Sequence, residues 1–204
     1  FTSPLGDGGG PTSLVINGGN DQSIFQLNGA NSYSGATTIT RGILIANHVS
    51  ALGGSNLIFN AGANSGILEL NTTGGTTFTR SLGTLPNQVQ WLGNGGFSAG
   101  AGTNTATGAV VVNLGGAGAT VTWGSGGFVP SGSTLQFNQA VGTTAGTSAN
   151  PSLGVVDFQN TIDFGALTTR TIQVENGTYA FDTAGVAANV TAYDAKLSGQ
   201  LIST

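Results

Sequence analysis

Eight carboxylates and a single histidine are the side chains that could do acid–base chemistry in this chain. Asp157 and Asp163 are six residues apart and could approach each other on adjacent strands, with Arg170 close by in the sequence. Paired acids cleave glycosidic bonds, but an enzyme acting on polysaccharides usually adds further acids and basic side chains in one groove. Because the chain has four Lys and Arg in total, we predict that it is not an enzyme.

The pattern Gly-x-Ser-x-Gly occurs at residues 96–100, with Ser98 at its centre. A nucleophile elbow needs a strand–turn–helix setting, with an acid and then a histidine later in the chain. The histidine of this chain, His48, comes before Ser98, so we interpret the pattern as a chance match. A lone histidine is a poor metal site, and Asp7 in the glycine-rich run 6–10 lacks the dense oxygen cluster of a calcium site. We predict no catalytic, metal or cofactor site.

The charge balance excludes several classes of partner. The net charge is −4, and the four basic residues are scattered along the chain, whereas a nucleic-acid backbone is neutralised by clustered Lys and Arg. An apolar run of about 18 residues, the length of a membrane-spanning helix, does not occur. There is no Met and no Cys, so we expect a processed product or an interior piece of a longer chain, without disulfides. We predict no nucleic-acid partner and no membrane insertion by this segment.

The composition predicts an all-β fold. Glycine contributes 36 of 204 residues, and the long charged and flexible side chains that favour helices are nearly absent. Short runs such as Thr171–Glu175 and Thr120–Trp123 alternate apolar and polar residues with the period of a strand. The runs are separated by Gly and Asn, which adopt turn conformations at low cost. We expect about fifteen short strands.

A sandwich, a barrel and a parallel β-helix all fit this strand spacing. Thr, Asn, Gln and Ser stand where antiparallel sheets carry charges, and stacked polar side chains form ladders along a solenoid. The segment 91–97 also returns in similar form at 123–128, a spacing typical of solenoid repeats, although coincidence in a biased composition is the alternative. We therefore predict a parallel β-helix with Gly/Asn-rich corners. The echo's aromatic residues are expected as core stacks, with glycan contact as the alternative: Trp91, Phe97, Trp123 and Phe128.

The stretch from residue 24 reads IFQLNGANSYSGATTITRGIL and is followed by SALG at 50–53. It resembles the autotransporter-associated β-strand repeat of passenger domains, which reads roughly LxLxGxNTYTGGTTIxxGTLxLxxxxALG. The departures are small: Ser32 and Ser34 replace Thr, Ala36 replaces Gly and Ile43 replaces Thr. The resemblance implies a right-handed parallel β-helix, export to a bacterial surface and no catalysis by the repeat.

Within this motif we expect an apolar set, a set of turn residues and a corner tyrosine. Leu27, Ile39 and Leu44 should point inward on successive strands. Tyr33 should lie across a corner with its hydroxyl hydrogen-bonded. The other motif positions are Gly29, Gly35 and Gly42, which should mark turns, and Asn31.

For domain organisation, we expect residues 1–12 to be a linker or bridging segment and residues 13–204 to be one β-helix module. That module should contain the passenger-type repeat at 24–54 and the echo described above. At about 22 residues per coil it would have about nine coils, spaced by about 4.8 Å.

The expected function is that of a non-catalytic structural segment of a bacterial surface or extracellular fibre or stalk, attached to the outer membrane. We expect neighbouring copies or repeats to stack end to end, through an interface formed by Phe1, Leu5, Leu197 and Leu201. An adhesin-type module that binds glycans is the first alternative, and a polysaccharide-active β-helix enzyme is the second.

Overall fold

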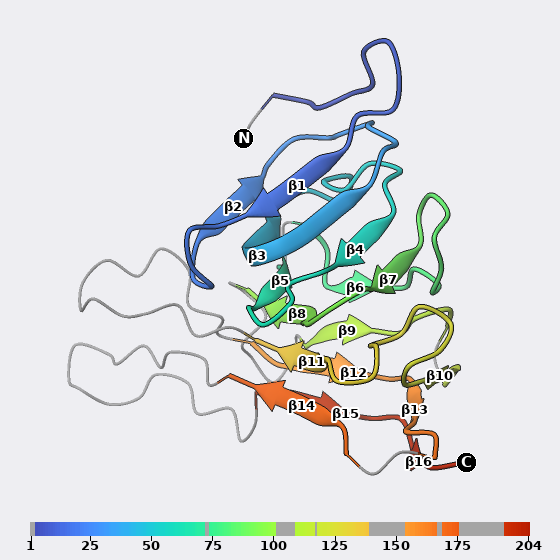
Figure 1. The fold of residues 1–204 in the computed structure, drawn as a ribbon. Coiled ribbons are helices and arrows are strands. Elements are labelled where there is room, and N and C mark those ends of the chain that lie inside the picture. Colours follow the sequence, from blue (N-terminus) through green and yellow to red (C-terminus); the bar gives the residue numbers. More distant parts are fainter. Residues whose placement is uncertain are drawn as a thin grey trace, which may run out of the picture.

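The computed structural model describes residues 3–71, 74–100, 109–116, 118–138, 154–166, 169–175 and 194–204. These residues form strands joined by turns and irregular segments, with no helix among them (Figure 1). The all-β prediction is therefore confirmed. The strands are β1 (Leu14–Asn17), β2 (Ile24–Leu27), β3 (Thr37–Ala46), β4 (Leu57–Phe59), β5 (Gly66–Leu70), β6 (Thr77–Phe78), β7 (Val89–Trp91), β8 (Gly95–Ala99), β9 (Val110–Val112), β10 (Thr120–Thr122), β11 (Thr134–Phe137), β12 (Val156–Phe158), β13 (Thr161–Asp163), β14 (Thr171–Val174), β15 (Ala195–Leu197) and β16 (Leu201–Ile202).

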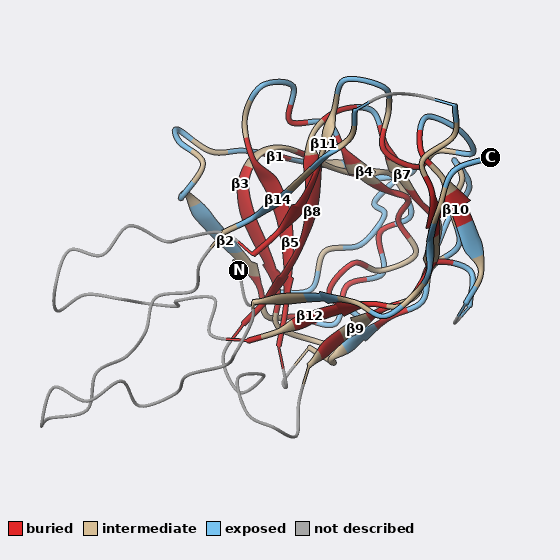
Figure 2. Ribbon diagram, turned by 90° about the horizontal axis from the view of Figure 1, so that it is seen from below, coloured by how far each residue is buried: buried red, intermediate tan, exposed pale blue. Residues whose placement is uncertain are grey.

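The strands pair in parallel, and most partners are not neighbours in the sequence. They form sheets of nine, four and three strands, with the orders β15-β12-β9-β6 and β10-β13-β16 in the two smaller ones. Seen from below, the strands curl around a common interior (Figure 2). Parallel strands need long crossover connections, so each sheet is a stack built by successive passes of the chain. This arrangement is consistent with the predicted β-helix.

Strand β3 belongs to two stacks because it turns at Gly42, whose φ is +96°. Its first half pairs with β1 and β4, and β4 pairs with β7; we call this stack the first face. Its second half pairs with β2 and β5, and the stack continues through β8, β11 and β14; we call this stack the second face. One continuous strand therefore contributes to both faces, on either side of one glycine.

The expected length of about 22 residues per coil fits the first two passes of the second face but not the later ones. On the second face the partner of Phe25 is Leu44, nineteen residues later, and the partner of Leu44 is Leu68, twenty-four residues later. Phe97 is paired with a residue forty positions further on, Phe137. The passes lengthen because the early ones contain the two faces and a corner, whereas later ones add strands of the smaller sheets. Among the described residues, the longest stack is consequently six strands deep rather than nine.

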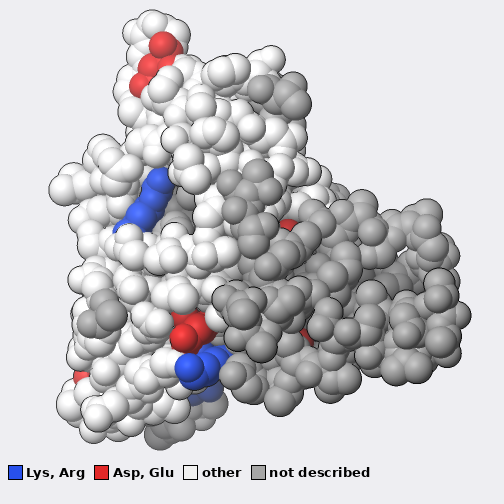
Figure 3. Space-filling model, turned by 180° about the vertical axis from the view of Figure 1, so that it is seen from behind, with Lys and Arg blue, Asp and Glu red and all other residues white. Residues whose placement is uncertain are grey.

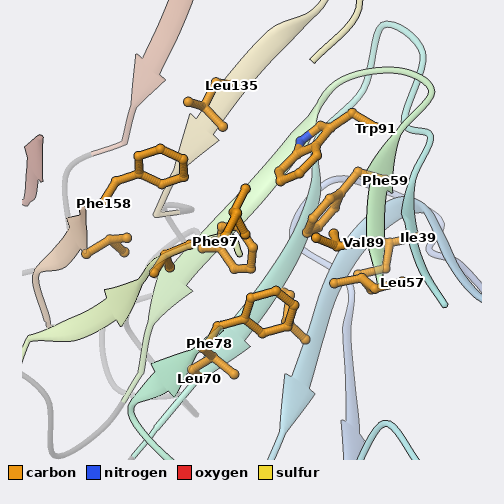
Figure 4. Close-up of a cluster of buried hydrophobic side chains, with 14 of the residues drawn as sticks. Ile39, Leu57, Phe59, Leu70, Phe78, Val89, Trp91, Phe97, Leu135 and Phe158 are labelled. Atoms are coloured by element: carbon orange, nitrogen blue, oxygen red, sulfur yellow. The ribbon is translucent and has the colours of Figure 1, made fainter. Parts of the chain in front are cut away.

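Aromatic side chains hold the interior together. Phe59 lies between Trp91 and Phe97, with ring centroids 4.8 Å and 5.4 Å away, and Phe78 reaches Phe97 at 4.9 Å (Figure 4). The network continues from Trp91 to Phe128 at 5.4 Å. These separations are those of favourable aromatic pairs. The rings therefore cross-link both faces and the smaller sheets into one core.

The four aromatic residues of the sequence echo are all buried, with Trp123 the most exposed at 3%. They are not equivalent positions on successive passes, however. Phe97 lies in register with Phe137, and Trp91 packs edge-on against Phe128. Their burial agrees with a core role, whereas the echo itself does not match the strand register.

Three asparagines form a ladder where strands of the second face end. Asn47 donates its amide to Asn28 Oδ1 at 2.9 Å and accepts from Asn71 Nδ2 at 2.9 Å. Each asparagine directly follows the last residue of β2, β3 or β5. The parallel register brings the three side chains into one column, so identical amides satisfy one another, as the polar composition predicts.

Replacing Asn47 by Ala should destabilise the protein more than replacing Asn28 by Ala. The first change removes the partner of two amides, and the second removes the partner of one. We expect a loss of about 1–3 kcal/mol for Asn47→Ala, measured by chemical denaturation. Equal losses for the two variants would mean that the amides do not act as a ladder.

Candidate functional site

The passenger-type motif forms a tightly hydrogen-bonded corner. Leu27, Ile39 and Leu44 are all buried, as expected. Tyr33 is completely buried, and its hydroxyl lies 2.7 Å from Thr37 Oγ1. The Thr37 hydroxyl donates in turn to Ser55, 2.8 Å away. A buried hydroxyl needs such partners, so the corner tyrosine is tied to the corner of the next pass.

Asn31 connects the corner to the segment that precedes β1. Its side chain accepts from Leu5 N at 2.7 Å and donates to Ala51 O at 2.6 Å. Leu5 O in turn accepts from Ser32 N, and Leu5 packs against the core of its own chain. The segment around Leu5 thus lies on the first corner as a further layer. The expected contact of Leu5 with a neighbouring copy stays a prediction.

Asp7 fastens the same segment. Its carboxylate accepts hydrogen bonds from the hydroxyl and amide of Ser34 and from the amide of Thr12. These bonds, that of the Ser34 hydroxyl first, hold the pKa of Asp7 below its ordinary value. The carboxylate predicted to be a poor calcium ligand is therefore engaged within the protein.

Two motif glycines are required by close approach. A Cβ on Gly42 would lie 2.6 Å from Ser23 O, at a φ of +96° that side chains rarely adopt. A Cβ on Gly35 would lie 2.4 Å from Thr12 O, although Gly35 is not among the positive-φ glycines. Gly29 is buried. Glycine is thus required at Gly42 for a conformational reason, although this residue lies inside β3 and not in a turn between strands, and at Gly35 for a steric reason.

Gly35→Val and Gly42→Val should both lower the melting temperature. Left-handed backbone costs a side chain about 1–2 kcal/mol, and the contacts with backbone oxygens add to it. Each kcal/mol corresponds to about 2–4 °C in a chain of this size. Gly54→Ala is the control, since a Cβ there meets nothing within 4 Å. Wild-type melting of both valine variants would contradict this account of the corner.

The carboxylates proposed as an enzymatic pair are used separately. Asp157 accepts from Ser198 Oγ and lies 3.7 Å from Lys196 Nζ. Asp163 accepts from Thr204 Oγ1 at 2.5 Å and from Gly165 N at 2.8 Å. These two bonds, that of Thr204 first, lower the pKa of Asp163.

Arg170 binds neither carboxylate in the contacts that the structure describes. It donates to Phe164 O and covers the ring of Trp123 at 5.7 Å. The three residues therefore serve three different local contacts.

Ser98 lies within strand β8, completely buried, and not on an exposed turn. His48 is in a different corner, where its Nδ1 accepts from Ser50 N at 3.0 Å. Among the described residues, no three His, Cys, Asp or Glu side chains lie close enough to hold a metal ion. Figure 3 shows that charged side chains are few on the face it draws.

The residue that sequence reasoning missed is Glu69, the fourth residue of β5. It is 1% exposed, and neither carboxylate oxygen has a hydrogen-bond partner among the described residues. Its register neighbours are Ile45 on β3 and Ser98 on β8, and Gly100 lies close enough that a Cβ there would be 2.4 Å from Glu69 Oε1. Burial raises the pKa of Glu69 to about 7. The Gly-Ile-Leu-Glu-Leu run had no signal for this beyond an acid at a strand centre.

Stability should fall as the pH rises because of Glu69. Its folded pKa of about 7 lies above the ordinary value of 4.5, so the native state holds its proton more tightly than the unfolded state. The contribution is fully present below about pH 4.5 and is lost as the pH rises through about 7, a change of about 3 kcal/mol.

Denaturant unfolding at pH 5 and pH 8 measures this contribution. Glu69→Gln should remove most of the pH dependence and stabilise the protein at pH 8. Glu175→Gln, at the end of β14, is the control and should leave the dependence in place. A Glu69→Gln variant with the wild-type pH profile would show that this carboxyl is not the titrating group.

The residues expected at a stacking interface have different environments. Leu197 is half-buried and packs against the core, and Leu201 is 52% exposed on β16. Phe1 lies outside the described residues. The proposed contact between copies therefore stays a prediction.

Comparison with protein-family models, with curated proteins and with solved structures finds no match. The resemblance to the passenger-associated repeat consequently rests on the motif at residues 24–54 alone. In the described part of the chain, no helix is long and apolar enough to cross a membrane.

Proposed function

We propose that this chain is a non-catalytic structural segment of a right-handed parallel β-helix. The observation that carries the proposal is the second face, where six parallel strands stack in register from β2 to β14 (Figure 1). Crossovers between parallel strands of one sheet are right-handed in nearly all proteins, which supports the handedness. A stack of this kind resists deformation along its axis through its backbone hydrogen bonds.

The proposed setting is a stalk or fibre on a bacterial surface or outside the cell, attached to the outer membrane. The composition supports it: the chain has no Cys, four Lys and Arg, and a coat rich in Thr, Asn, Ser and Gly. A coat of this kind offers few cleavage sites to proteases that act after basic residues. The passenger-type motif at 24–54 favours the same setting.

We further propose that neighbouring copies stack end to end on the second face. The inward column of this face begins with Phe25, 36% exposed, and ends with Val174, 48% exposed, whereas its intermediate members are buried. The outer edges of β2 and β14 have no partner strand among the described residues, and open edges are templates for further strands. A strand β2 placed below β14 would continue the same column in the same direction.

The lengthening of the passes limits this contact. Nineteen residues separate Phe25 from its partner, whereas thirty-seven separate Phe137 from Val174. The first pass of one copy is therefore too short to cover the whole last pass of another. The proposed contact is therefore confined to the second face. The other parts of the last pass are not covered by the neighbouring copy.

Engineered disulfides test the stack, since the chain has no Cys. Ile24 and Gln173 begin and end an outward column of the second face, so Ile24→Cys/Gln173→Cys should link separate copies on oxidation. In-register neighbours lie about 4.8 Å apart, within disulfide reach. We expect a ladder of covalent oligomers in gels and fibres in electron micrographs.

Two further pairs control the experiment. Thr38→Cys/Ile58→Cys joins residues of one chain that lie in register on the first face and should close within the monomer. Val15→Cys/Gln173→Cys combines different faces and should not link copies. Closure of the internal pair together with discrete Ile24→Cys/Gln173→Cys monomers at high concentration would refute stacking while leaving the parallel fold intact.

A further inference from the structure

A pocket lies at the step where the passes of the chain widen. It has a volume of about 190 Å³ and is bordered by the corner after β3 and by the segment around β6. Leu70 and Phe78 provide apolar walls from the wider pass, and Leu52 provides one from the narrower pass. The corner after β3 covers ten residues before β4 begins, whereas the corresponding connection from β5 to β7 covers eighteen residues, those of β6 included. The longer connection extends beyond the shorter one, and the pocket lies on the resulting step, which we call the ledge.

Arg80 brings a cation to the pocket. Its guanidinium donates to the carbonyl oxygens of Ser55 and Gly53 and lies 5.9 Å from the ring centre of Phe78. The ion pairs found among the described residues join other cations, namely Arg41 with Asp21 and Lys196 with Asp157. A guanidinium has five N–H donors, and these two contacts leave further donors for a ligand. Burial lowers the pKa of Arg80, which agrees with a cation held out of water.

His48 faces the same pocket. Its Nδ1 accepts from Ser50 N, so a neutral imidazole carries its proton on Nε2 and offers a donor. Thr77 and Thr79 also line the pocket. A lining that combines polar donors with apolar side chains suits a ligand that is rich in acceptor oxygens and has an apolar face.

We propose that this pocket binds an acidic sugar residue, with its carboxylate on Arg80 and its ring against Leu52 and Leu70. Arginine is the side chain best suited to a carboxylate, through two parallel hydrogen bonds. A sugar fits better than a bare carboxylate, since hydroxyl donors and acceptors meet the threonines and the imidazole. The site is independent of the structural role proposed above and gives the glycan-binding alternative a specific location.

Titration calorimetry with glucuronate at low salt tests the site in the whole chain. Wild-type protein should bind glucuronate at least tenfold more tightly than glucose or acetate. Arg80→Gln should weaken binding at least tenfold, and His48→Ala should weaken it severalfold. Arg170→Gln is the matched control, because Arg170 also donates to a backbone carbonyl and lies outside this pocket.

Arg80→Gln could also loosen the corner that Arg80 holds, so a second variant separates binding from folding. Thr79→Glu leaves both carbonyl contacts of Arg80 in place and adds a negative charge to the pocket wall; it should abolish binding at wild-type melting temperature. Wild-type affinity in Thr79→Glu, or acetate or a peptide with a free terminal carboxylate binding as tightly as glucuronate, would overturn the proposal. Failure of wild-type protein to bind glucuronate would overturn it as well.

Discussion

Hydrogen bonding between parallel strands of successive passes is the constraint on which the rest of this structure depends. A parallel strand satisfies its backbone only through partners that arrive after a long connection. Here each partner is supplied by the next pass, so residues in register form columns along the stack. The chemistry of a column is therefore decided strand by strand, and every residue has to be compatible with the ones above and below it.

The columns explain both the core and its exceptions. The inward column from Leu44 through Leu68 to Phe97 is apolar throughout and is buried. The asparagine column satisfies itself because identical amides repeat at the spacing of the strands. Glu69 has no such arrangement, since Ile45 precedes it in its column, and burial without a hydrogen-bond partner among the described residues raises the pKa of its carboxyl to about 7.

The sequence predicted the corner residues best and the pairing of strands least well. The motif at 24–54 gave the inward leucines and isoleucine, the buried tyrosine and the glycine at 42, since each type has a narrow range of environments. The sequence did not predict β8, because the run from Gly95 looks like a turn. Its glycines are needed for another reason: a Cβ on Gly96 would lie 1.9 Å from Gln136 O. Close approach of neighbouring strands and turn formation select the same residue, so composition cannot separate them.

The repeat length was mispredicted for a related reason. Trp91 and Trp123 look equivalent in the sequence, yet both contact Phe128. Trp91 ends β7 on the first face, whereas Trp123 follows β10 of the three-stranded sheet. A repeat of constant length is visible in a sequence when every pass of the chain has connections of the same length. Here the connections lengthen as new strands enter, so equivalent positions drift apart. The ledge pocket is equally invisible in the sequence, because it exists through the difference between two passes.

Two of the few cations, Arg80 and Arg170, donate hydrogen bonds to backbone carbonyls at corners and loops of the chain. Strand ladders satisfy backbone groups by pairing, but the carbonyls of corners and loops face no neighbouring strand. Arg80 donates to the carbonyls of Gly53 and Ser55, and Arg170 donates to that of Phe164. A guanidinium supplies several donors in one plane and stays charged when partly buried, so one side chain can replace a missing strand at a corner. Arg80 and Arg170 thus act where the parallel ladder is interrupted, whereas Arg41 lies within β3 and pairs with Asp21. The remaining donors of Arg80 are what the ledge pocket can present to a ligand.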